Sequence, residues 1–151
     1  MISPEIIRRF PFFSGFTMDQ LVALAMTAEE ITVPKDYYFL HEGDEVNYMH
    51  LVLEGEIALV ITLPQKDKEI IVNTLGIGDL FGWSALVPPH SATAGVKAIT
   101  PSRVVVFDGQ QLRQRFENEC EFGYLMMVKI AQVIRERLNA LRIETLAYSN
   151  D

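Results

Sequence analysis

The chain has 151 residues, the usual size of one domain, and 49% of them are apolar, which is enough for one hydrophobic core. It carries 13 lysines and arginines against 20 aspartates and glutamates, a net charge of −7 that disfavours binding to a polyanion such as DNA. A single cysteine excludes an internal disulfide and a cysteine-ligated metal centre, so no metal is expected. Acidic residues interrupt the most apolar stretch, 49–63, and no secretory signal is recognisable, so we expect a cytoplasmic protein without a membrane segment.

Helical signals dominate residues 1–28. Ser3 is followed by a proline, the pattern of an N-cap residue before a proline in the first helical turn. This predicts a short helix that Pro11 ends. Thr17 followed by Gln20 is a capping box, and the apolar residues after it have helical spacing. A second short helix is therefore expected, ending near residue 27.

Residues 30–108 alternate between turn residues and short runs of β-branched or aromatic residues. This pattern predicts a mainly β domain, an antiparallel β-roll or jelly roll. Residues 83–86 interrupt it, because they lie between Gly82 and two prolines and suit a single helical turn better than a strand. The expected strands are residues 31–33, 37–40, 49–53, 57–63, 69–75, 93–99 and 103–107.

The last part of the chain, residues 109–148, has a helical pattern again. Asp108 is a candidate N-cap, Asn118 marks a bend, and residues 119–147 contain no proline, so one helix of about 40 Å is expected. Apolar and small residues in this helix recur by alternating steps of four and three, the spacing of a coiled-coil seam. We predict a homodimer through this seam, the alternative being that the stripe packs on the β-roll. The seam residues are Met127, Ala131, Ile134, Leu138, Leu141 and Thr145.

Two motifs in this order resemble a known family. They are YFLHEGDEVNYMHLVLEGEIALV at residues 38–60 and GDLFGWSAL at residues 78–86, with Gly43 and Gly55 at tight turns. The sequence resembles the cyclic-nucleotide-binding domain of Crp/Fnr-type bacterial regulators over nearly its whole length. The resemblance implies one sensor domain, 1–151, with N-terminal helices, a β-roll and a long C-terminal dimerisation helix.

The family's ligand signature is a Gly-Glu pair before a one-turn helix, then an arginine and a hydroxyl residue about ten positions later. The resemblance implies that the glutamate binds the ribose, the arginine neutralises the cyclic phosphate, and the hydroxyl and backbone amides complete an anion cradle. Here Gly82 and Thr93 match, but Trp83 replaces the glutamate and Ala92 replaces the arginine. Two lost contacts to charged groups weaken binding about a hundredfold or more, so tight binding of cyclic AMP or cyclic GMP is not expected.

The cofactor is thus unknown, and a small anionic or aromatic ligand suits the altered pocket, unless the Trp83 ring fills it. His90, after two prolines, is expected to be a solvated surface residue. The predicted ligand-binding residues are Gly82, Trp83, Ser84, Ala85, Ser91, Ala92 and Thr93.

Other classes remain as alternatives to a non-catalytic sensor. A structural dimerisation module without a ligand is one. A cupin-like enzyme is disfavoured because His41, His50 and His90 lack metal-ligand spacing, and haem would have only these isolated histidines as axial ligands. In the regulators this helix leads into a helix-turn-helix domain, whereas this chain stops at Asp151. No DNA binding by this chain alone is expected, whether that domain was removed or never existed.

Overall fold

The computed structural model describes residues 1–65 and 67–149. Its first elements are three short helices, α1 (Pro4–Arg8), the 3-10 helix η1 (Pro11–Phe13) and α2 (Met18–Met26). The side chain of Ser3 accepts a hydrogen bond from the Glu5 amide, and Thr17 and Gln20 form both halves of the capping box. Both predicted helices are confirmed. Pro11 ends the first region as expected, but it also begins η1, because a proline is compatible with a first helical turn.

Two four-stranded antiparallel sheets form the roll. The order of sheet A is β1-β8-β3-β6, and that of sheet B is β2-β7-β4-β5. The predicted strands are all present, with ends that differ by at most three residues, and β6 is an additional strand of two residues that no alternation pattern could have revealed. The strand bounds are β1 (Ala28–Val33), β2 (Tyr38–Leu40), β3 (Tyr48–Glu54), β4 (Ile57–Leu63), β5 (Lys68–Leu75), β6 (Leu80–Phe81), β7 (Gly95–Ala98) and β8 (Ser102–Asp108).

The core has two main parts, one on each face of sheet A. Side chains such as Met49 and Phe107 point to the helices, where they pack with residues including Leu24 and Phe122. Val52 and Val104, which alternate with them along the strands, lie between the two sheets. The predicted fold, a mainly antiparallel β-roll with flanking helices, is confirmed.

The turn between β3 and β4 depends on Gly55. Its φ is +100°, and a Cβ at this position would contact the Ser102 Oγ and lie 2.8 Å from the Pro101 carbonyl oxygen. Only glycine fits both the left-handed backbone and the close approach of the neighbouring chain.

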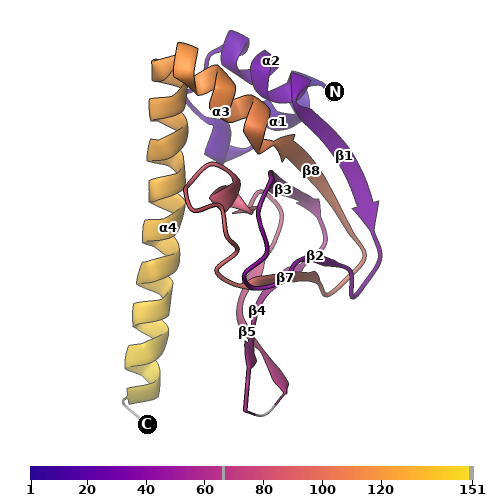
Figure 1. The fold of residues 1–151 in the computed structure, drawn as a ribbon, viewed down its shortest axis with the longest axis vertical. Helices are drawn as coiled ribbons and strands as arrows, with labels where there is room; N and C mark the ends of the chain where they lie inside the picture. Colours follow the sequence, from indigo (N-terminus) through magenta and orange to yellow (C-terminus); the bar gives the residue numbers. More distant parts are fainter. Residues whose placement is uncertain (66, 150–151) are drawn as a thin grey trace.

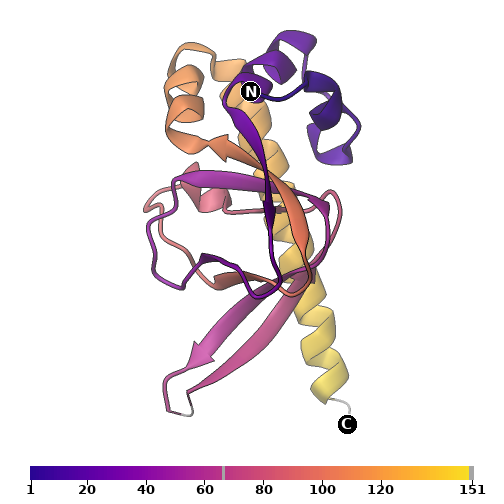
Figure 2. The ribbon, with the colours of Figure 1, turned by 90° about the vertical axis from the view of Figure 1, so that its right-hand side faces the viewer.

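Two helices close the chain, α3 (Gly109–Asn118) and α4 (Cys120–Ser149). Asp108 caps α3 by accepting from the Gln110 and Gln111 amides, and Glu119 has a non-helical backbone that separates the two helices. With 30 residues, α4 is about 45 Å long and runs beside the roll to the level of the β4–β5 hairpin (Figures 1 and 2). No helix within the described residues is long and apolar enough to cross a membrane.

Candidate functional site

The 3-10 turn η2 (Trp83–Ala85) is the predicted single helical turn. It follows Gly82, whose φ is +73° and whose added Cβ would lie 2.6 Å from the Tyr48 carbonyl oxygen. A glycine is required here because the turn lies against the backbone of β3. The Ala85 amide donates to the Gly82 carbonyl and closes the turn.

A cavity of about 250 Å³ lies beside η2. Most of its lining is apolar and comes from both sheets, from the segment that follows His90 and from α4. Five of the seven predicted ligand residues line it together. Its lining residues are Leu40, Val46, Leu59, Ile61, Val72, Phe81, Gly82, Trp83, Ser84, Ala92, Thr93, Ala94, Val96 and Arg137.

The other two predicted residues lie beside the cavity without lining it. Ala85 is buried and packs with Val46 and Ala92. Ser91 pairs with Glu45 in an isolated bridge, and its hydroxyl donates to the Gly43 carbonyl. The side chains of Ala85 and Ser91 therefore make these contacts and do not line the cavity.

Trp83 is half-buried and packs in part against the core on the helix side of sheet A. The indole ring therefore contacts that core and also lines the cavity. The cavity of about 250 Å³ remains beside the ring, so the indole does not fill the whole site.

Arg137 is the residue that sequence reasoning missed. It extends from α4 to the roll, lines the cavity, and donates a hydrogen bond to the carbonyl of Leu80, just before η2. Burial lowers the pKa of its guanidinium, against the opposing charges of Asp79 and Glu136. Within residues 1–65 and 67–149, no carboxylate forms an ion pair with it. A cation thus reaches the cavity from α4, an element that the sequence analysis did not connect with the ligand site.

His90 is not the solvated surface residue that the sequence suggested. Its Nδ1 lies 2.7 Å from the Ser84 carbonyl oxygen, and its Nε2 lies 2.7 Å from Nη1 of Arg113. Arg113 can only donate, so Nε2 accepts and Nδ1 donates to Ser84. His90 therefore connects η2 to α3, a contact between distant segments that the two preceding prolines did not reveal.

The predicted dimerisation seam divides along α4. Met127 is half-buried and packs against the helix-side core. From Ala131 onward the seam is exposed, with Ile134 at 38%, Leu138 at 48% and Leu141 at 47%. Thr145 is exposed too, and its hydroxyl donates to the Leu141 carbonyl. Beyond Met127 the stripe does not cover the roll.

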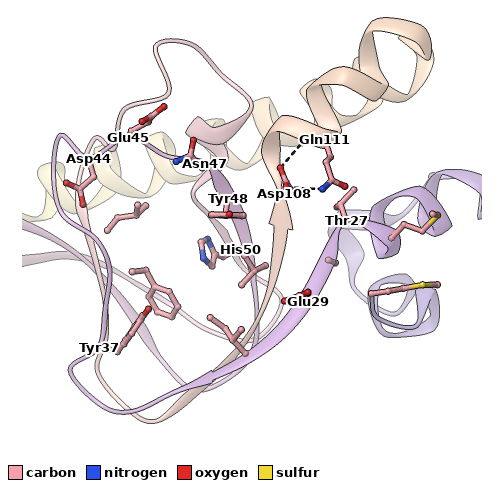
Figure 3. A pocket seen from close by; sticks show the side chains of 17 residues that line it. Thr27, Glu29, Tyr37, Asp44, Glu45, Asn47, Tyr48, His50, Asp108 and Gln111 are labelled. Atoms are coloured by element: carbon pink, nitrogen blue, oxygen red, sulfur yellow. Dashed lines mark hydrogen bonds between the residues drawn. The ribbon is translucent and has the colours of Figure 1, made fainter.

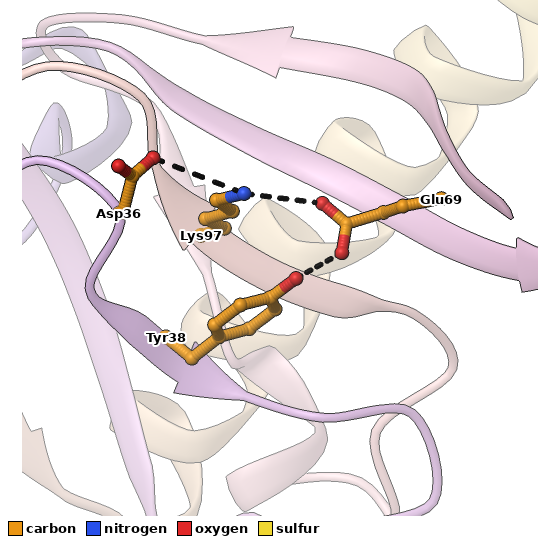
Figure 4. Close-up of polar contacts among 4 residues, drawn as sticks. All are labelled: Asp36, Tyr38, Glu69 and Lys97. Atoms are coloured by element: carbon orange, nitrogen blue, oxygen red, sulfur yellow. Dashed lines mark hydrogen bonds and ion pairs between the residues drawn. The ribbon is translucent and has the colours of Figure 1, made fainter. Parts of the chain in front are cut away.

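A polar network on the outside of sheet B connects three of its strands (Figure 4). The Tyr38 hydroxyl donates to Glu69, and Nζ of Lys97 lies 3.4 Å from Glu69 and 3.8 Å from Asp36. The hydrogen bond to Glu69 raises the pKa of Tyr38 to about 12, and the same bond lowers the pKa of Glu69. These groups satisfy one another, so the network has a structural role in the sheet.

The cyclic nucleotide-binding domain family matches residues 30–119, more than half of the chain. The chain therefore belongs to the cyclic nucleotide-binding domain family. Among solved structures it is similar to a protein from Geobacter metallireducens assigned to the cyclic nucleotide-binding proteins, with 32% identity, a TM-score of 0.83, and coverage of 91% of this chain and 99% of that one.

Two further relatives extend the comparison. A CRP-like cAMP-activated global transcriptional regulator of Mycobacterium tuberculosis is 23% identical over 137 residues, which cover 91% of this chain and 61% of the regulator. This chain thus spans about three fifths of that relative. The regulatory subunit of a cAMP-independent protein kinase A from Trypanosoma brucei shares the fold, with 18% identity, a TM-score of 0.75, and coverage of 93% and 49%.

Proposed function

We propose that this chain is a non-catalytic, ligand-sensing regulatory domain whose η2 cavity binds a small molecule with an apolar body and one anionic group. The observation that carries the proposal is Arg137, a cation in a largely apolar cavity that has a single backbone acceptor. Removing a guanidinium from water is costly unless an anion compensates. A ligand carboxylate would make a bidentate, charge-assisted pair with it.

Cyclic AMP and cyclic GMP fit this cavity poorly. Trp83 and Ala92 line it, and the resemblance to the family implies a glutamate and an arginine at these two positions. The volume of about 250 Å³ also lies below the roughly 300–1,000 Å³ of sites for drug-sized ligands. The fold itself does not require cyclic AMP, since it occurs in a kinase subunit described as cAMP-independent.

Binding at this cavity would be transmitted through α4. An anion that engages Arg137 competes with the Leu80 carbonyl for its guanidinium, so occupancy changes how α4 is held against β6. The exposed seam lies on the same helix. We infer that the ligand regulates the position of α4 relative to the roll, and with it any partner that α4 contacts.

The test uses thermal unfolding and calorimetry with hexanoate, benzoate and cyclic AMP as probes. At least one carboxylate should raise Tm, because a ligand that binds only the native state stabilises it. The effect should be lost in Arg137→Gln and kept in Arg135→Gln, an exposed position on the same helix. Binding of cyclic AMP at micromolar concentration, or equal carboxylate responses in the two variants, would overturn the proposal. A lack of response to both carboxylates would favour a structural dimerisation module.

We also propose a homodimer through the α4 seam. Ile134, Leu138 and Leu141 expose apolar surface in a coiled-coil pattern, and pairing with a second copy would bury it. Leu138→Asp places a charge in that seam and should give monomers in light scattering, whereas Asn139→Asp, one position along, should not. A monomeric unmodified chain at tens of micromolar, where even modest affinities are visible, would refute the dimer.

We infer further that the 151 residues do not read DNA by themselves. Their net charge of −7 opposes the counterion release on which DNA affinity depends. A salt-sensitive, sequence-dependent gel shift with this chain would contradict the inference.

A further inference from the structure

A second and larger cavity, of about 820 Å³, lies in the roll apart from Arg137 (Figure 3). It is bounded by β1, β2, the segment that leads into β3, the end of β8 and the start of α3, and none of its lining residues belongs to α4. Of the described residues, only Leu40 lines both this cavity and the one at η2. The two sites are therefore separate in their chemistry.

The charged side chains that line this cavity are carboxylates. Asp44 and Glu45 stand on one side of it, and Glu29 and Asp108 stand on the other (Figure 3). Asp108 is occupied in capping α3, and Asp44 accepts from the His41 amide at 2.8 Å. Glu29 and Glu45 have no side-chain hydrogen bond or ion pair within the described part of the chain. Among the described residues no lysine or arginine lines the cavity, and the positive group among its lining residues is the α-amino group of Met1, so the four carboxylates outnumber the positive charge there.

His50 is an independent sign of a ligand. It projects from β3 among the side chains that line the cavity (Figure 3), and it is only 7% exposed. Its buried Nδ1 lies near Gly82 and the backbone of Tyr48, but within the described residues it makes no hydrogen bond of good geometry. Burial keeps the ring neutral, so it adds no positive charge to the site. A buried, unpaired polar atom is costly, and such groups in native proteins often face a missing partner.

Part of the remaining wall is apolar or aromatic, and Thr27, Asn47 and Gln111 add neutral polar groups. Phe39, Ile31 and Val106 also line the cavity, and the lining residues Tyr37 and Tyr48 expose 43% and 50% of their surface. Aromatic faces attract cations, and the aliphatic side chains suit methylene groups. A metal ion is disfavoured, because within the described residues no three histidine, cysteine or carboxylate side chains are grouped closely enough to hold one.

The geometry points to a site for a linear organic polycation, such as an aliphatic polyamine. Its methylene chain lies along Phe39, one ammonium group pairs with Glu45, another pairs with Glu29, and His50 faces the chain between them. Because the carboxylates lie on two separate sides, the site favours a ligand with two positively charged groups over a ligand with one. This site does not depend on the function proposed for the η2 cavity.

Calorimetry with spermidine at low ionic strength tests the site. The double variant Glu29→Gln with Glu45→Gln should weaken binding about tenfold, the combined effect of two exposed ion pairs. The control, Glu117→Gln with Glu121→Gln, removes the same charge from exposed positions outside the cavity and should leave the Kd unchanged. Butylamine, with one ammonium group, should bind at least about tenfold more weakly than spermidine.

Two further variants make the outcome specific. His50→Phe keeps an aromatic ring on Phe81 and should weaken spermidine binding severalfold, while Arg137→Gln should not change it. Three results would each overturn the proposal. They are an equal loss of spermidine affinity in the two double glutamate variants, binding of Mg²⁺ as tight as that of spermidine, and no heat of binding with spermidine. An unchanged affinity in His50→Phe would remove the imidazole from the site and also count against it.

Discussion

His50 makes the stability of this protein depend on pH well above the range in which carboxylates titrate. Its ring stacks on Phe81 with centroids 4.5 Å apart and contacts the edge of Phe39. Burial lowers the pKa of His50 from 6.5 to about 3, and the backbone of Tyr48 opposes this shift. Acidification from pH 8 to pH 5 therefore protonates the imidazole in the unfolded chain and leaves it neutral in the native protein.

The size of the effect follows from proton linkage. The native pKa is depressed, so the neutral ring contributes its full stability above pH 6.5, and that contribution is lost as the pH falls from 6.5 toward about 3. Each pH unit over which only the unfolded state binds the proton costs about 1.4 kcal/mol. At pH 5, about 1.5 units below the unfolded pKa, the free energy of unfolding should be lower by about 2 kcal/mol.

Urea unfolding at pH 8, 7, 6 and 5 measures this change, with His50→Phe as the reference. Phenylalanine can keep the stack on Phe81 and carries no proton, so subtracting its pH profile removes the contributions of all other groups. The difference between the two proteins should be flat above pH 6.5 and should reach about 2 kcal/mol at pH 5. Parallel profiles over this range would show that His50 is not buried as a neutral ring, and the argument would fail.

Three other experiments with substituted proteins test the site and the fold. Trp83→Glu together with Ala92→Arg supplies an acceptor for the ribose and a positive charge for the phosphate, so the double variant should bind cyclic AMP measurably in calorimetry. Each single change should increase binding less. A stable double variant that does not bind cyclic AMP would contradict the placement of the two positions. Gly55→Ala should lower the free energy of unfolding by about 3 kcal/mol. Gly15 also has a positive φ, but no atom lies within 4 Å of its added Cβ, so Gly15→Ala should cost about 1 kcal/mol. Equal losses of stability in urea unfolding would argue against a steric clash at position 55. Thr17→Ala removes a cap and should cost about 1 kcal/mol in the same assay, and an unchanged midpoint would count against the capping box.

Much of the fold could be predicted because its signals are local. The capping box at Thr17 joins residues three apart, and the strand and turn pattern of residues 30–108 repeats over a few residues. Strand ends shifted because pairing sets them: Thr93 and Ala94 precede β7 and line the cavity instead. The two-residue strand β6 exists only through its pairing with His50 and Leu51.

The sequence by itself indicated the family and the helical turn after Gly82, and it predicted the loss of the two residues that recognise a nucleotide, because these are matters of residue type and short spacing. Only the tertiary structure decided that Arg137 from α4 reaches the η2 cavity, that His50 is buried beside Phe81, and that the seam beyond Met127 stays exposed. Each of these facts is a contact, or the absence of one, between elements far apart in the chain. Periodicity along one helix or strand specifies which side chains share a face, but the packing of that face against another element sets the charge and the burial at the site.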